Sequence, residues 1–382
     1  MECITVFDKI DELNSEYVDF WQEICEIESP TFYKEGIDRV GQTIISHVKQ
    51  FGWQVEVLKQ SVAGNAICIT MNPDAKKPPV VFSGHLDTVH PLGIFGYPAV
   101  KRDGEKIYGP GVTDCKGGVV ASLLAMVALE KCGYRERPVK LILQTDEEVS
   151  SLPSNKETVR FMAKCAKGCV AFLNCEPHEK GALVLQRKGI IRYIFDITGK
   201  AAHSSAPYDG ASAICEASYK VIEIEKFKDR DGITTSCGII EGGTAENTVP
   251  EKCRITVDIR FPDADSLEFI KGEMQRIADI CHVEGTSCEL ITKSFRVSMD
   301  KSEANDRLFE RISEIFDRNG LVHVEKQKGN YGSDACDMTA YGIPSVDSIG
   351  VRGGMIHSKY EYAYISSLAE SAKMLVSVAV EI

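Results

Sequence analysis

The sequence lacks any apolar run long enough to cross a membrane. No stretch approaches the roughly 18 consecutive apolar residues that a spanning helix needs. The stretch 1–17 carries acidic residues among its first ten and has no long apolar core, so it does not have the pattern of a signal peptide. We therefore expect a cytoplasmic protein with no membrane partner.

Positive charge is also scarce. The chain has 44 Lys and Arg against 56 Asp and Glu, which gives a formal net charge of −12. A surface with this balance repels the phosphates of nucleic acids and of anionic lipids. The composition therefore argues against nucleic acid as a partner.

Paired cysteines are missing as well. The 14 cysteines form no C-x-x-C ladder, and most have apolar neighbours, as Cys68 and Cys215 do. This pattern favours buried free thiols in a reducing compartment over a disulfide framework.

The chain does have the length and apolar content for two domains. It has 382 residues, 43% hydrophobic and 26% charged, without an internal repeat. Up to about Arg187, apolar strands alternate with helical patterns, which predicts an α/β sandwich with parallel strands. The polar stretch Lys101–Lys106 is predicted to be a turn.

A different pattern begins after Arg187. Alternating apolar and polar residues predict two-sided strands, most clearly over 254–261, and apolar spacing over 267–281 predicts an amphipathic helix. The strand–helix–strand–strand–helix–strand order is that of a ferredoxin-like α+β fold. We expect this insert at residues 188–297, between the two parts of a first domain at residues 1–187 and 298–382.

The most informative stretch is 139–151, which reads VKLILQTDEEVSS. An apolar strand ends by delivering Asp146, Glu147 and Glu148 in succession. Such crowded acids repel one another unless they face solvent or cations. The stretch is therefore either a solvated acidic loop or a site in which one Glu binds zinc and its neighbour moves protons. No role is assigned to Asp146.

Other residues with the chemistry of zinc ligands follow two more apolar strands and a glycine-rich loop. They are His85 and Asp87 after one strand, Glu176 after another, Asp114 in the loop GPGVTDCKGG, and His357 near the C-terminal end. Because ligands bind beyond the carboxyl ends of strands in open α/β sheets, these groups are expected to converge. Taken singly, each also fits a structural histidine, a helix cap, a turn or a surface acid.

Taken together, these residues fit a two-zinc site. Two zinc ions that share one carboxylate, with one His and one further acid each, have three protein ligands apiece and an open position for a bridging hydroxide. Three carboxylates and one hydroxide balance the charge of two zinc ions. A further acid remains free to act as a base.

The order of motifs resembles a known family. The motifs are GHLDTV, GPGVTDCKGG, TDEEVSS, NCEP, KAAHSSAP, GGTAENTVP, DIRF and SDA, followed by GGMIHSKYEY. They span nearly the whole chain and resemble the dinuclear-zinc peptidases that include glutamate carboxypeptidase, acetylornithine deacetylase, succinyl-diaminopimelate desuccinylase and aminoacylase. The last segments are most similar to the glutamate carboxypeptidase branch. The resemblance implies a zinc-peptidase-like α/β/α catalytic domain with an inserted ferredoxin-like lid that mediates dimerisation.

The resemblance also implies roles for the site residues. Asp114 would bridge the metals, with His85 and Glu176 completing one zinc site and Glu148 and His357 the other. Glu147 would be the general base, and Asp87 would form a hydrogen bond with His85 and fix its tautomer. Two departures from the family pattern, Ser150 and Cys115, are expected to touch no ligand. Cobalt or manganese are possible substitutes for zinc.

The remaining implied residues concern the substrate. His203 would reach from the lid of one subunit into the site of the other and stabilise an oxyanion, which implies a homodimer. Arg260 and Asn247 would lie near a substrate carboxylate, and Gly354 would also contact substrate. A surface histidine and a solvated strand face are the simpler interpretations of His203 and Arg260.

The expected activity is hydrolysis of an amide bond next to a free-carboxylate amino acid. A zinc-bridged hydroxide would attack, with Glu147 as base. An N-acyl-amino-acid deacylase, of the acetylornithine or succinyl-diaminopimelate type, is the alternative enzyme. A non-catalytic dimeric binding protein is the alternative of another class, although no ligand is missing from the sequence.

Overall fold

A computed structural model describes residues 2–382 and divides the chain into two compact units. The first unit contains the described residues up to Gln186, together with Lys301–Gly329 and Ser333–Ile382. The second contains Arg187–Asp300 and the short segment Asn330–Gly332. This short segment was not predicted from the sequence, because it is separated along the chain from the rest of its unit.

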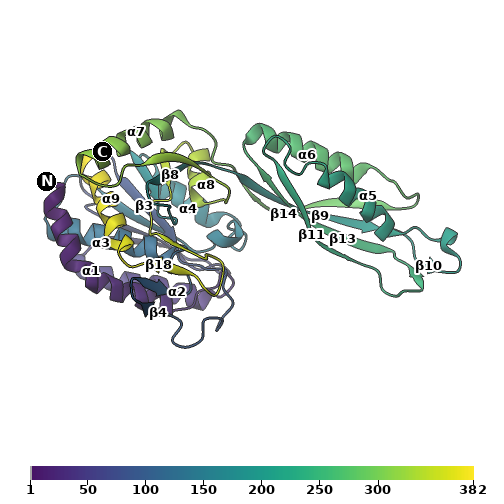
Figure 1. The fold of residues 1–382 in the computed structure, drawn as a ribbon, viewed down its shortest axis with the longest axis horizontal. Helices are drawn as coiled ribbons and strands as arrows, with labels where there is room; N and C mark the ends of the chain where they lie inside the picture. The colour runs from purple at the N-terminus through teal and green to yellow at the C-terminus, as the bar shows by residue number, and fades with distance from the viewer. Residues whose placement is uncertain (1) are drawn as a thin grey trace. The chain divides into compact units, whose positions relative to one another are not determined.

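The first unit is built on an eight-stranded sheet (Figure 1). In spatial order its strands are β1 (Gln54–Leu58), β2 (Ala66–Met71), β6 (Val139–Gln144), β3 (Val80–His85), β7 (Ala171–Asn174), β16 (Ser345–Asp347), β8 (Ala182–Arg187) and β15 (Glu325–Gly329). The central strands β6, β3, β7 and β16 are parallel. The expectation of parallel strands is wrong for β2, which pairs antiparallel with both β1 and β6.

Helices cover both faces of this sheet, so the expected α/β fold class is confirmed. The larger core takes apolar side chains from α1 (Cys3–Glu26), α2 (Lys34–Val48), α3 (Lys116–Lys131), α7 (Glu303–Arg318) and α9 (Ser367–Glu381). The smaller core lies under α4 (Glu157–Ala166) and α8 (Asp334–Ala340). Along β3, Val80 and Phe82 enter the larger core and Val81 the smaller one, as the pleat of a strand requires.

A second, smaller sheet of the first unit joins distant parts of the chain. Its order is β17 (Gly353–Gly354), β18 (Tyr362–Tyr364), β5 (Lys106–Tyr108) and β4 (Lys101–Asp103). The predicted turn over Lys101–Lys106 is therefore wrong, because most of this stretch forms a β4–β5 hairpin. The sheet places the segment after β5 beside the segment between β17 and β18.

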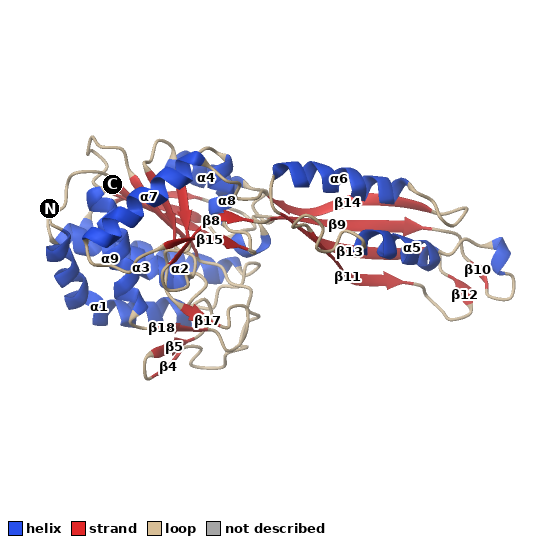
Figure 2. Ribbon diagram, turned by 45° about the horizontal axis from the view of Figure 1, so that its top comes forward, coloured by secondary structure: helices blue, strands red, loops and turns tan. Residues whose placement is uncertain are grey.

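The second unit has the expected ferredoxin-like element order. Its strands and helices are β9 (Gly189–Thr198), α5 (Ala213–Glu225), β11 (Thr234–Gly242), β13 (Lys252–Phe261), α6 (Ala264–Asp279) and β14 (Ser287–Arg296). The antiparallel sheet has the order β11-β13-β9-β14, and α5 and α6 pack on one face of it (Figure 2). A two-stranded antiparallel sheet of β10 (Ala202–His203) and β12 (Thr248–Val249) extends from one end. Alternate residues of β9 and β13 form the core, as their sequence pattern predicts.

Three short 3-10 helices complete the described elements: η1 (Lys49–Phe51), η2 (Glu147–Val149) and η3 (Pro207–Asp209). Within residues 2–382 no helix combines the length and the apolar character that crossing a membrane demands.

Candidate metal centre

Three neighbouring parallel strands deliver the central residues of the site. β3 ends at His85, η2 begins at Glu147 soon after β6, and Glu176 follows β7. Because parallel strands end at the same edge of a sheet, these side chains lie close together although they are far apart in the sequence.

Asp114 lies between two histidines. Its Oδ1 atom is 3.0 Å from Nε2 of His85, and its Oδ2 atom is 3.2 Å from Nε2 of His357. Each oxygen of one carboxylate therefore faces a different imidazole nitrogen. This is the arrangement that a carboxylate shared by two metal ions requires.

Each histidine also has an acid of its own. Oε2 of Glu148 is 3.2 Å from Nε2 of His357, and Oε1 of Glu176 is 3.7 Å from Nε2 of His85. The structure thus brings all five predicted ligands together as two sets of three that share Asp114. One His with two carboxylates is a donor set that suits zinc and leaves a coordination position open.

The acids of this cluster are difficult to ionise in the absence of a cation. Burial, followed by the charge of Asp114, raises the pKa of Glu148 to about 8. The same two causes raise the pKa of Glu176 well above its ordinary value. Hydrogen bonds to Asp114 and Glu148 raise the pKa of His357 to about 11, so a proton on His357 supplies positive charge here. Divalent cations at the shared carboxylate would supply it instead.

Cys115 is closer to the site than we expected. Its thiol sulfur and the ligand atoms of His85 and Glu176 lie within 4.8 Å of one another. Burial raises the pKa of the Cys115 thiol well above its ordinary value, and the thiol donates a hydrogen bond to the carbonyl of Cys175. Because only a thiolate is a good ligand, the structure favours the carboxylates.

Asp87 contacts both His85 and the adjacent pair of acids. Nδ1 of His85 is 3.5 Å from Oδ1 of Asp87 and 2.9 Å from its backbone carbonyl oxygen. The carboxylate of Asp87 also accepts hydrogen bonds from the backbone N–H groups of Glu147 and Glu148, and from the hydroxyl of Thr31. One buried acid therefore fixes a predicted ligand and the backbone of the adjacent pair of acids. Thr31 was not among the residues predicted from the sequence.

Asp146, which had no predicted role, organises the loop that follows. It is fully buried and accepts hydrogen bonds from the backbone N–H of Ser154 and the hydroxyl of Thr158. Of the three consecutive acids, Asp146 thus forms hydrogen bonds with the loop that follows, whereas Glu147 and Glu148 lie at the cluster of predicted metal ligands. Ser150 follows at a φ of 58°, a left-handed conformation that glycine adopts more easily.

Sequence reasoning also missed Glu361. It is fully buried, and burial followed by the charge of Asp114 raises its pKa to about 8. Its Oε1 atom accepts hydrogen bonds from the backbone N–H groups of Thr113 at 2.9 Å and Asp114 at 3.0 Å. The signal was present as the glutamate in HSKYEY, but nothing in the sequence connects it to residue 114.

The predicted substrate residues are mostly in the other unit. His203 is exposed on β10, and the backbone of Asn247 is close to it, since its carbonyl accepts a hydrogen bond from Ser204 N–H. Arg260, on β13, donates to Asp258 through Nε at 2.7 Å. Gly354 belongs to the first unit, where an added Cβ would come within 3.1 Å of the Tyr362 hydroxyl.

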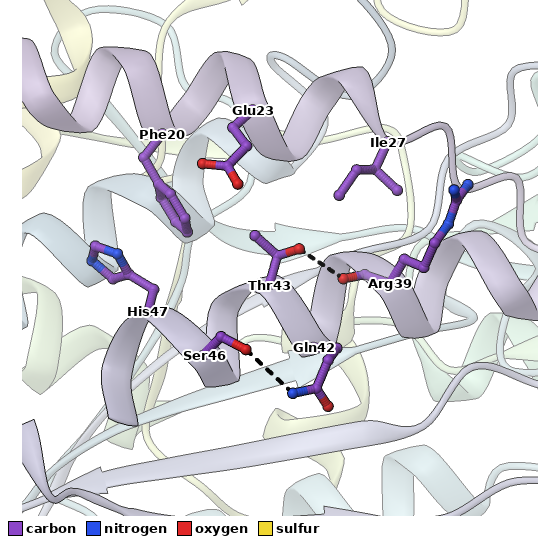
Figure 3. Close-up of a pocket in the computed structure, with 8 residues that line it drawn as sticks. All are labelled: Phe20, Glu23, Ile27, Arg39, Gln42, Thr43, Ser46 and His47. Atoms are coloured by element: carbon purple, nitrogen blue, oxygen red, sulfur yellow. Dashed lines mark hydrogen bonds between the residues drawn. The ribbon is translucent and has the colours of Figure 1, made fainter. Parts of the chain in front are cut away.

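A pocket elsewhere on the first unit does not involve these residues. It has a volume of about 560 Å³ and lies between α1 and α2 (Figure 3). Its lining residues are Phe20, Glu23, Ile27, Arg39, Gln42, Thr43, Ser46 and His47. None of the predicted site residues is among them. The candidate metal centre is therefore identified by its cluster of His, Asp and Glu side chains and not by this pocket.

Comparison with known proteins agrees with this geometry. Residues 81–381 match the Peptidase family M20/M25/M40. The chain belongs to this family. The resemblance seen in the motifs is therefore confirmed, and the protein is a metal-dependent peptidase that hydrolyses amide bonds.

Relatives within the family include two kinds of enzyme. The chain is 28% identical to carboxypeptidase G2 of Pseudomonas sp. (strain RS-16) over 91% of its own length and 84% of the relative's. It is 30% identical to succinyl-diaminopimelate desuccinylase of Ruegeria pomeroyi, over 56% and 60%. The fold matches that of YXEP from Bacillus subtilis, described as a dinuclear metal-binding peptidase, with a TM-score of 0.72 and 15% identity over 97% and 100% of the chains.

Proposed function

We propose that the protein is a dinuclear zinc carboxypeptidase or dipeptidase that cleaves the amide bond next to an amino acid with a free carboxylate. The observation that carries this proposal is Asp114, whose two oxygens face His85 and His357 at 3.0 and 3.2 Å. Glu147 lies beside this cluster without being needed as a ligand. The relation to carboxypeptidase G2 over most of both chains supports the substrate class.

In this proposal His85, Asp114 and Glu176 hold one zinc ion, and His357, Asp114 and Glu148 hold the other. Cobalt or manganese could take their place, since imidazole and carboxylate ligands suit these metals as well. When bound, such a pair lowers the pKa of water to about 7 and polarises a carbonyl group.

The chain's own residues then move the protons. Glu147 accepts a proton from the attacking water and returns it to the leaving amine. Asp87 holds the backbone of Glu147 through the hydrogen bond to its N–H, which sets the position of the base relative to His85. The side chains of Glu147 and Asp87 are both buried, so little solvent competes with the proton transfer.

The proposal is tested by removing metal with a chelator and restoring it before a panel of substrates is assayed. The panel contains dipeptides, folyl-type glutamate conjugates, and acetylated and succinylated amino acids, each with zinc, cobalt and manganese. Peptide cleavage that returns with two metal equivalents supports the proposal. Preference for acetyl or succinyl groups supports the deacylase alternative, and binding without turnover supports the non-catalytic one.

Arg260 is proposed to bind the free carboxylate of the substrate. Asp258 forms ion pairs with Arg260 of its own strand and with Arg192 of the paired strand β9, so it holds both guanidinium groups in place. A bidentate Arg–carboxylate contact contributes roughly 1.5–3 kcal/mol. Arg260→Ala is therefore expected to raise the KM of free-acid substrates roughly 10-fold or more and to leave that of their amides nearly unchanged. Equal changes for both substrate forms would reject the assignment.

His203 and Asn247 cannot join Arg260 around one carboxylate within a single second unit. β13 runs from Lys252, close in the chain to β12 of the two-stranded β10–β12 sheet, to Arg260 near its other end. At about 3.3 Å per residue, these positions are roughly 26 Å apart. If His203 and Arg260 act on one substrate, they come from two copies of the chain.

The second unit has a surface that could join two copies. β11 is an edge strand of its sheet, and it exposes Ile239 and Ile240. The neighbouring helix α5 exposes Tyr219 and Ile222. Edge strands with exposed apolar residues pair readily with another strand. We propose that two copies form a homodimer through β11 and α5.

A complementation experiment tests the dimer and the role of His203 together. His203→Ala and Glu147→Gln are each expected to reduce kcat, the first by roughly 10²–10³ if His203 stabilises an oxyanion. Mixed dimers of the two variants should regain activity, because one site then combines an intact Glu147 with the partner's His203. Absence of any recovery in verified mixed dimers, or full activity of His203→Ala alone, would contradict the proposed role.

A further inference from the structure

The loop that carries Asp114 is bonded to the segment that carries His357 at points away from the metal ligands. Gly109 N–H donates to the carbonyl of Glu361 at 3.3 Å, and the hydroxyl of Thr113 donates to the carbonyl of Tyr362 at 2.5 Å. β5 pairs with β18 immediately beside these bonds. The two loops therefore meet along a continuous seam.

One side chain in this seam acts on the Asp114 backbone itself. Oε1 of Glu361 accepts both the Thr113 and the Asp114 N–H groups, while Oε2 faces Nε2 of His90 at 3.4 Å. The backbone bonds of the seam set the course of the two loops. The Glu361 bonds fix the orientation of the peptide from which the Asp114 side chain projects.

A shared carboxylate needs this kind of control. Both oxygens of Asp114 have to lie at coordination distance from two separate ions at once, and such distances tolerate about 0.2 Å. A small rotation of the Asp114 backbone would move one oxygen away from its histidine. Glu361 resists this rotation from the segment that also carries His357.

We infer that Glu361 is a positioning residue for the metal pair, which fixes the bridging carboxylate of Asp114 relative to His357 through two backbone hydrogen bonds. This inference rests on the proposed dinuclear site. Glu361 contacts neither substrate nor reacting atoms in this scheme. Its effect is on metal affinity and on the geometry around the metals.

Three substitutions separate hydrogen bonding from charge. Glu361→Gln retains an oxygen at the position of Oε1 without the charge, Glu361→Asp retains the charge on a side chain one methylene shorter, and Glu361→Ala removes both. Zinc affinity is measured by competition with a chromophoric chelator, and site geometry by the visible absorption of the cobalt-loaded protein.

The Asp and Ala variants are expected to bind zinc roughly 10–100-fold more weakly, which is the usual effect of losing a residue that orients a metal ligand. Their cobalt spectra should change, while Glu361→Gln should stay close to the wild type in both measurements. If the Ala variant does not fold, the comparison of Asp with Gln decides. Wild-type affinity in the Asp variant, or loss of affinity only in the Gln variant, would overturn the inference.

Glu216 of the second unit provides a matched control. It is also buried, and its Oε2 accepts two consecutive backbone N–H groups, from His282 and Val283, at 2.8 Å each. Glu216→Ala is expected to lower thermal stability without changing metal affinity or the cobalt spectrum. Because metal binding needs no substrate, a protein that binds zinc and cleaves no peptide would reject the proposed function and leave this comparison intact.

Discussion

Asp114→Asn is expected to weaken binding at both metal positions and to reduce peptide hydrolysis to background. Asparagine has nearly the same shape, but it offers one oxygen where the carboxylate offers two. Oδ1 and Oδ2 of Asp114 face different histidines, so no single oxygen can serve both. The charge lost is also the one that lies between the two histidines. The loss in affinity should exceed the roughly 10–100-fold loss that follows removal of a residue that only orients a metal ligand.

Glu176→Gln is the matched control for this experiment. Glu176 lies at 3.7 Å from His85 and belongs to one of the two proposed ligand sets, so its loss should weaken one metal and leave close to one equivalent bound per chain. Metal content after dialysis and calorimetric titration with zinc distinguish the two variants. If Asp114→Asn retained one tightly bound ion, as Glu176→Gln should, Asp114 would be a ligand of one metal alone.

The strand ends of this site could be predicted from the sequence because the signal there is local. An apolar run followed at once by polar ligands marks His85, Glu147, Glu148 and Glu176, and the rule for parallel sheets brings such ends together. Asp114 and His357 could be named as candidate ligands from residue type, but their specific roles needed the family resemblance, because they lie in loops whose positions depend on the β5–β18 pairing. Strands of two or three residues leave too short a pattern to be predicted.

The supporting residues could not be predicted for a different reason. The roles of Thr31 and Glu361 and the second role of Asp87 depend on hydrogen bonds between groups that are distant in the sequence. Thr31 donates to the carboxylate of Asp87, while Glu361 and Asp87 accept from backbone N–H groups. Any threonine or acid can make such bonds, so residue type carries no information about them. Asp146 shows the same limit, since the sequence places it in the acidic run but not against Ser154 and Thr158.

The largest expected effect without metal loss is that of Glu147→Gln. General bases contribute roughly 10²–10⁴ to rate, so kcat should fall by about that factor while both metals remain bound. Glutamine preserves the size of the side chain, and the backbone N–H that bonds Asp87 is unaffected. KM should change little, because the proton transfer contributes only in the transition state.

Glu148→Gln distinguishes this result from general damage to the site. The two residues are adjacent, and both donate a backbone N–H to the Asp87 carboxylate, at 3.2 and 3.3 Å. Glu148 lies 3.2 Å from His357 and is the proposed ligand of the pair, so its variant should lose metal and recover part of its activity with excess zinc. Glu147→Gln should keep its metal and gain nothing from added zinc. If the two variants behaved alike, the division of labour between the adjacent acids would be wrong, and Glu147 would have to be counted as a ligand.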